Sequence, residues 1–159
     1  MVRFAGIVNL TGHEEKLWAR WHVPKGKEQH EGELTALCLA AFKAKVLRRG
    51  PHVGKYHPDA ELEIPFGDDA AMHLVLLERD RSTIGIGEVL RRIMEVYQGC
   101  PHDVLWVFDT NTRIETLFAV ARQEHFEIPA NHWFSIYPNA VANFHGEIWR
   151  NAKGDTTHV

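Results

Sequence analysis

The chain has 159 residues, of which 45% are hydrophobic and 25% charged, so it fits one globular domain over residues 1–159 and excludes a second full domain. The formal net charge of -3 excludes a generally basic surface, and nucleic-acid binding would therefore need a local basic patch. The two cysteines form no disulfide framework, and neither a signal peptide nor an apolar run of roughly 20 residues is present, so we expect a soluble, cytoplasmic protein without a membrane segment.

The first third of the chain predicts two short strands followed by a helix. Residues 2–10 and 17–23 are rich in β-branched and aromatic side chains around a polar turn, which favours strands. From His30, apolar side chains recur at three- and four-residue spacings, which predicts a helix that ends at the basic turn before Gly50. The apolar positions of this helix are Leu34, Leu37, Cys38, Ala41 and Val46.

Two alternating stretches, residues 57–64 and 72–80, predict a β-hairpin whose turn lies at residues 66–69. Because alternate side chains of a strand share a face, one face of the first stretch carries carboxylates and the other carries apolar side chains. The acidic face has Asp59, Glu61 and Glu63, the apolar face has Ala60, Leu62 and Ile64, and one face of the second stretch has Met72, Leu74, Leu76, Glu78 and Asp80.

Pairing across this hairpin can bring Asp59 and Glu78 together. Carboxylates that converge on one point repel one another unless a cation lies between them, and oxygen ligands suit Mg²⁺ or Mn²⁺. The alternative is an ordinary polar face exposed to solvent.

The second half of the chain alternates helices and strands. Ser82 or Thr83 can cap a helix that ends near Gly99, and the apolar run Asp103–Phe108 predicts a buried strand parallel to the Glu78 strand. A third helix is expected from Arg113 to about Glu124, capped by Asn111 or Thr112. Residues 132–150 predict a further strand or hairpin near the sheet edge, and residues 151–159 predict a frayed end.

These elements predict an α/β fold with a central mixed β-sheet flanked by helices. The core is expected over about residues 30–125, with the N-terminal strands at 2–23 and the C-terminal hairpin at 132–150 as additions.

Five segments, in this order, resemble the core of the PD-(D/E)XK nuclease superfamily. They are HEGEL (30–34), HPDAELEI (57–64), LLERDRST (76–83), EVLRRIMEVY (88–97) and DVLWVF (103–108). More narrowly, they resemble the nuclease-like part of replication-relaxation and plasmid-mobilisation accessory proteins. The resemblance implies a restriction-endonuclease-like core and divalent-metal-dependent phosphodiester hydrolysis of DNA in a mobile-element, plasmid or phage context.

The resemblance also implies a set of catalytic residues. Glu33 corresponds to the acid on the first helix, Asp59 to the first metal ligand and Glu78 to the second, with Mg²⁺ or Mn²⁺ as the cofactor. Asp80 stands where the superfamily has a lysine that stabilises charge on the phosphate.

Three outcomes follow from the missing lysine. Asp80 can serve as an extra ligand or general base, or Arg91 or Arg92 can reach the site from the following helix. In the third outcome catalysis is lost, and the domain is an inactive module that binds DNA or a protein partner, including a second copy of itself as a homodimer.

A basic rim around the acidic centre would bind a DNA backbone, with Arg79, Arg91 and Arg92 as the candidate contacts. The other basic residues of this rim would be Lys43, Lys45, Arg48, Arg49 and Arg81. The alternative is an ordinary charged helix face. A third class of function, a small-molecule binding α/β protein, also remains open, whereas the spacing of the histidines disfavours a zinc site.

Overall fold

The computed structural model describes residues 27–41, 45–49, 56–66 and 69–159. The strands predicted at residues 2–10 and 17–23 lie outside these ranges, as does Lys43. The side chains of Lys45, Arg48 and Arg49 also lie outside what is described, so the basic rim stays a prediction for these four residues.

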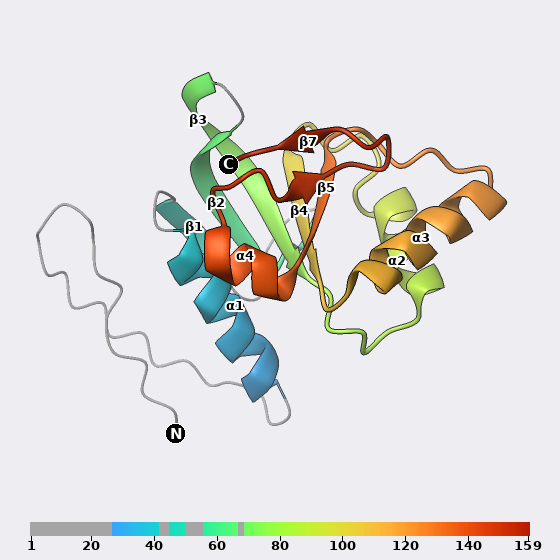
Figure 1. Cartoon of the computed structure of the whole chain (residues 1–159), viewed down its shortest axis with the longest axis horizontal. Coiled ribbons are helices and arrows are strands. Elements are labelled where there is room, and N and C mark those ends of the chain that lie inside the picture. Colours follow the sequence, from blue (N-terminus) through green and yellow to red (C-terminus); the bar gives the residue numbers. More distant parts are fainter. Residues whose placement is uncertain (1–26, 42–44, 50–55, 67–68) are drawn as a thin grey trace, which may run out of the picture.

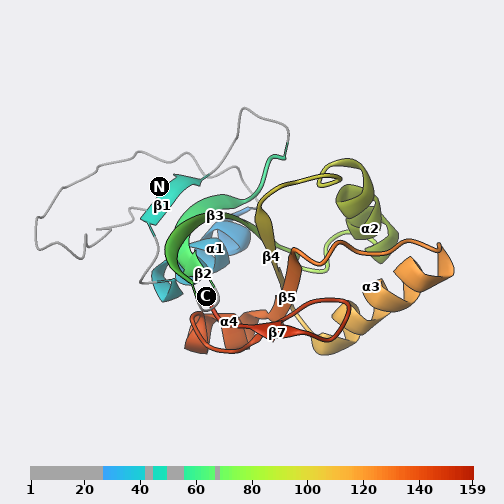
Figure 2. The ribbon, with the colours of Figure 1, turned by 90° about the horizontal axis from the view of Figure 1, so that it is seen from above.

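The described residues form an α/β fold with a mixed sheet of seven strands in the order β1-β2-β3-β4-β5-β6-β7 (Figures 1 and 2). The strands are β1 (Lys45–Arg49), β2 (Ala60–Phe66), β3 (Asp69–Arg79), β4 (Asp103–Phe108), β5 (His132–Ile136), β6 (Trp149–Arg150) and β7 (Thr156–Thr157). The helices are α1 (Glu28–Ala40), α2 (Ile86–Glu95), α3 (Asn111–Gln123) and α4 (Tyr137–Asn143). The α/β class and the central mixed sheet are therefore confirmed.

Two apolar clusters place helices on both faces of the sheet (Figure 2). Leu34 and Leu37 of α1 and Ala140 of α4 pack on one face. Side chains of α2 and α3 pack on the other face, around Trp106 and Phe108 of β4. Both faces of β4 are consequently buried, which explains why its sequence is almost wholly apolar.

The first helix is shorter than predicted. It ends at Ala40, and residues 45–49 form the strand β1, which pairs antiparallel with β2. The apolar spacing marks the buried face of α1 correctly at Leu34 and Leu37, but Val46 belongs to the next element. A short stretch of mixed polar and apolar residues is compatible with either state, and here pairing with β2 decides it.

The predicted hairpin is confirmed. Strands β2 and β3 pair antiparallel with Ala60 opposite Leu77. Ala60, Leu62 and Ile64 are fully buried on the α1 face, as the two-residue period requires. The hairpin therefore brings the start of β2 beside the end of β3.

Helix α2 connects β3 to β4, which pair in parallel as predicted. Gly85, rather than Ser82 or Thr83, precedes the helix, and no side chain caps it. Helix α3 begins two residues before Arg113, because the Thr110 side chain accepts a hydrogen bond from the backbone N–H of Arg113 and so caps the helix. The two helix starts were predicted within a few residues, but the capping residues were wrong.

The C-terminal segment is not a simple hairpin. Strand β5 pairs in parallel with β4, and α4 separates β5 from the short strand β6, which pairs antiparallel with β5. The end of the chain is packed, because β7 pairs with β6 and Val159 is buried. Asn151 shapes this segment, since its side-chain oxygen accepts hydrogen bonds from the backbone N–H groups of Lys153 and Asp155. The prediction of a further strand within residues 132–150 is confirmed by β5, whereas the alternative of a simple hairpin and the prediction of a frayed end were wrong.

Within the described ranges, none of the helices combines the length and the apolar character needed to span a bilayer.

Candidate active site

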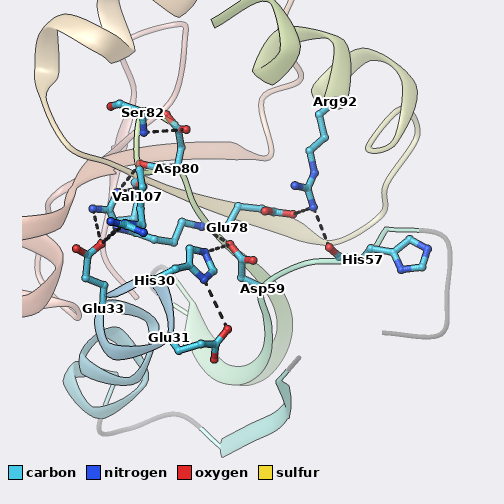
Figure 3. A network of polar contacts seen from close by, with 12 residues as sticks. His30, Glu31, Glu33, His57, Asp59, Glu78, Asp80, Ser82, Arg92 and Val107 are labelled. Carbon is cyan, nitrogen blue, oxygen red and sulfur yellow. Dashed lines mark hydrogen bonds and ion pairs between the residues drawn. The ribbon is translucent and has the colours of Figure 1, made fainter. Parts of the chain in front are cut away.

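The polar cluster of the domain lies where the end of β3 meets the start of β2 (Figure 3). Asp59 directly precedes β2, Glu78 and Arg79 end β3, and Asp80 follows it. The parallel strand β4 ends at the same edge, directly before Asp109. Ligands of α/β proteins commonly bind at the carboxyl ends of parallel strands, so the cluster occupies a favourable position for a site.

Glu78 is 2% exposed and faces α2. Its Oε1 atom accepts a hydrogen bond from Arg92 Nη2 at 2.7 Å and another from the Tyr97 hydroxyl. Burial raises the pKa of Glu78 well above its ordinary value, and the charge of Asp59 raises it further, whereas Arg92 and Tyr97 oppose the shift. Glu78 and Asp59 are therefore close enough to repel each other.

Asp59 lies between β3 and the first turn of α1. Its Oδ2 atom accepts a hydrogen bond from the backbone N–H of Arg79 at 2.7 Å and lies 3.4 Å from Nε2 of His30 (Figure 3). The hydrogen bond with Asp59 raises the pKa of His30 despite the opposing effect of partial burial. The hairpin thus brings Asp59 and Glu78 together, as the sequence predicted.

Glu33 belongs to a different group of charges on the opposite face. We define the Arg79 cluster as Glu33, Arg79, Arg81 and Asp109. The Arg79 guanidinium lies 2.8 Å from Oε2 of Glu33 and 2.5 Å from Oδ1 of Asp109. It also donates to the backbone oxygens of Asp80 and Val107. The Arg79 side chain is 2% exposed, so the structure places it inside the domain and not on a basic rim.

Asp80 does not join Asp59 and Glu78. Its carboxylate accepts hydrogen bonds from Nε and Nη2 of Arg113 on α3, and from the backbone N–H of Ser82. A carboxylate held by a bidentate guanidinium has few lone pairs left for another ligand. The structure therefore gives Asp80 a structural partner on α3, where the sequence suggested a catalytic one.

Only one of the two arginines from α2 reaches the site. Arg92 contacts Glu78 and also donates to the backbone oxygen of His57 at 2.8 Å. Arg91 lies on the exposed side of the helix, where it forms ion pairs with Glu88 and Glu95. The contact between Arg92 and Glu78 is one of the three outcomes predicted from the missing lysine.

The site residues predicted from the sequence did not include Tyr97 or Arg113. Tyr97 lay on the apolar face of a predicted helix, where an aromatic side chain normally signals packing alone. The signal available was its hydroxyl, since a buried tyrosine hydroxyl usually has a hydrogen-bond partner. Arg113 is 33 residues from Asp80, and nothing in the sequence pairs them.

Among the residues that the structure describes, no three His, Cys, Asp or Glu side chains are grouped so that they could hold a metal ion. The pair Asp59 and Glu78 supplies two carboxylates. A magnesium ion in proteins often takes one or two carboxylates and completes its shell with water and phosphate oxygens. The donor set therefore suits Mg²⁺ or Mn²⁺ bound together with a phosphate.

Comparisons of the chain with family models, with curated proteins and with solved structures each gave no match.

Proposed function

We propose that this domain is a DNA-processing nuclease of the PD-(D/E)XK type, with Asp59 and Glu78 as the ligands of Mg²⁺ or Mn²⁺. The coupling of these two carboxylates carries the proposal. Asp59 directly precedes β2 and Glu78 lies in the neighbouring strand β3; burial raises the pKa of Glu78, and the charge of Asp59 raises it further. A divalent cation between them would remove this repulsion. When bound, it would activate a water molecule and offset charge on a phosphodiester.

Among the described residues, no hydrogen bond ends on the second oxygen of either carboxylate, so this oxygen could bind such a cation. In the described part of the chain, the hydrogen bonds to Glu78 end on Oε1 and those to Asp59 end on Oδ2. Glu78 Oε2 and Asp59 Oδ1 accept none of them. The existing hydrogen bonds therefore fix the two side chains without occupying both of their oxygens.

Arg92 is the residue that we assign to the role of the missing lysine. Its guanidinium lies on Glu78, and its side chain is 32% exposed. A guanidinium stays protonated at any ordinary pH, so Arg92 would stabilise charge on the phosphate and would not act as a base. We do not assign this role to Asp80, because Arg113 already holds its carboxylate.

The order of elements supports a restriction-endonuclease-like core. Helix α1, the β2–β3 hairpin, helix α2 and strand β4 follow one another in the order that the resemblance requires. Strands β1 and β5 to β7 and helices α3 and α4 are additions to that order. With DNA as the substrate, a cytoplasmic location and a role in a mobile element, plasmid or phage are part of the same proposal.

A second candidate is an inactive module of the same fold that binds DNA or a protein partner. Its specific support is that arginines hold three of the four candidate carboxylates: Arg79 holds Glu33, Arg92 holds Glu78 and Arg113 holds Asp80. A guanidinium can take the place of a cation in a carboxylate cluster without any catalysis.

Calorimetry with Mn²⁺ separates these possibilities. We expect the wild type to bind Mn²⁺ and Asp59→Asn to bind it at least about tenfold more weakly, because a neutral amide is a poorer ligand than a carboxylate. Glu95→Gln on the exposed side of α2 is the matched control and should bind as the wild type does.

A cleavage assay on single-stranded, duplex and branched DNA in Mg²⁺ or Mn²⁺ completes the test. Cleavage by the wild type and none by Asp59→Asn is expected. Metal binding without cleavage of any DNA would favour the inactive module, and a wild type that binds no Mn²⁺ would refute the metal site.

A further inference from the structure

One oxygen of the Glu78 carboxylate accepts hydrogen bonds from two donors. Arg92 Nη2 and the Tyr97 hydroxyl both donate to Oε1. The two donors differ in their surroundings, because the Arg92 side chain is 32% exposed whereas Tyr97 is fully buried. One contact can therefore be exchanged with a ligand, and the other is fixed within the core.

The ring of Tyr97 is held on several sides by aromatic side chains. It stacks on Tyr56 at 5.8 Å between centroids and meets Trp106 edge-on at 5.5 Å. It also meets His132 edge-on at 5.9 Å. Trp106 Nε1 in turn donates to His132 Nδ1 at 3.0 Å, which fixes the histidine ring. Side chains of β4 and β5 thus set the position of the tyrosine that contacts β3.

We infer that Tyr97 is a positioning residue that keeps Oε1 of Glu78 turned into the core, so that Oε2 is left for the cation. This inference rests on the proposed function as far as the cation is concerned. The Tyr97 ring cannot follow the carboxylate if Glu78 turns, since its aromatic neighbours hold it.

Tyr97 and Arg92 consequently have different tasks. The Arg92 guanidinium lies 6.0 Å from the centre of the Tyr97 ring and supplies positive charge at the open side of Glu78. If Arg92 moves to a phosphate, the Tyr97 hydroxyl still orients the carboxylate. A metal ligand whose orientation is fixed by a neighbouring hydrogen bond binds more tightly than one that must first be ordered.

The test is Tyr97→Phe, which keeps the ring and removes the hydroxyl. Tyr137→Phe is the matched control, because Tyr137 lies under Arg79, away from Glu78. Two readouts are needed. The first is the pKa of the Glu78 carboxyl without metal, followed by ¹³C NMR, and the second is Mn²⁺ affinity by calorimetry.

In Tyr97→Phe we expect a higher pKa of Glu78, because a hydrogen bond to its charged form is lost, and about tenfold weaker Mn²⁺ binding. The control should leave both unchanged. An unchanged pKa of Glu78 in Tyr97→Phe would overturn the inference, as would unchanged Mn²⁺ affinity. If the wild type binds no Mn²⁺, the proposed function fails, while the pKa of Glu78 still decides whether Tyr97 holds the carboxylate.

The wild type gives a further readout should Tyr97→Phe not fold. A buried hydroxyl bonded to Glu78 is expected to give a proton signal that exchanges slowly with water. A Tyr97 hydroxyl that exchanges rapidly would overturn the inference without any variant.

Discussion

Glu78 and Arg79 are neighbours in β3 but belong to two opposite charge environments. Glu78 faces α2, where it has one arginine as a partner and Asp59 as a repelling neighbour. Arg79 faces α1 and α4, where its guanidinium contacts two carboxylates, two backbone oxygens and the ring of Tyr137. The two-residue period of a strand is what separates them.

Of the two environments, the one around Glu78 is better suited to binding a ligand. In the Arg79 cluster, each of the three guanidinium nitrogens of Arg79 donates a hydrogen bond, and these bonds join α1 to the end of β4. Around Glu78, Arg92 is the cationic partner, while burial and the charge of Asp59 oppose ionisation of the carboxyl group. The first arrangement stabilises the fold, whereas the second leaves capacity for a cation or a phosphate.

Arg79→Ala should have the largest effect on stability. Removing the guanidinium takes a shared partner from the partly exposed carboxylates of Glu33 and Asp109 and removes its hydrogen bonds to two backbone oxygens, which together should cost about 3 kcal/mol. Urea denaturation at neutral pH measures the change in the free energy of unfolding. A loss close to zero would contradict a structural role of the Arg79 cluster.

Acid should destabilise the folded protein by protonating His132, whose ring meets that of Tyr97 edge-on. Burial lowers the pKa of His132 from 6.5 to about 4, so the folded state disfavours its protonation. The associated stability is present above pH 6.5 and is lost as the pH falls towards 4, by up to about 3 kcal/mol.

His132→Gln keeps an acceptor near Trp106 and removes the titration. Urea denaturation of both proteins between pH 7 and pH 4 should show a smaller loss for the variant. Parallel curves would mean that His132 is not buried as a neutral side chain.

Glu78 should have the opposite effect on the pH dependence of stability, because its ionisation destabilises the folded protein as the pH rises. Its pKa is raised in the folded state, so the folded protein binds the proton more tightly than the unfolded chain, and stability falls as the pH rises through the folded pKa. Glu78→Gln cannot ionise and should lose less stability than the wild type as the pH rises above the ordinary pKa of glutamate. Identical pH dependence of the two unfolding free energies would contradict the raised pKa of buried Glu78.

Arg91→Ala should have the smallest effect. Arg91 forms ion pairs with Glu88 and Glu95 on the exposed side of α2, and exposed pairs add little to stability. We expect no measurable change in the urea midpoint or in Mn²⁺ affinity. A large loss of Mn²⁺ affinity would instead place Arg91 at the site and weaken the distinction from Arg92.

The sequence predicted the hairpin and the proximity of Asp59 and Glu78 from local alternation, and the buried strand β4 from a short apolar run. It failed where pairing at a distance decides the outcome. Residues 45–49 form a strand because they pair with β2. Residues 156–157 form a strand because they pair with β6. The ion pair of Arg79 with Glu33 joins residues 46 positions apart, so no spacing in the sequence could indicate it.

The two edge strands have a consequence for how the domain meets other chains. Strand β7 has only two residues, and β1 has an irregular register against β2 between Val46 and Arg48. Long, flat edges act as templates for strand addition, and short or bulged edges resist it. In the part of the chain that the structure describes, neither edge offers such a template, so the sheet is protected against edge-to-edge aggregation, and a second copy would more readily dock through side chains than through backbone pairing.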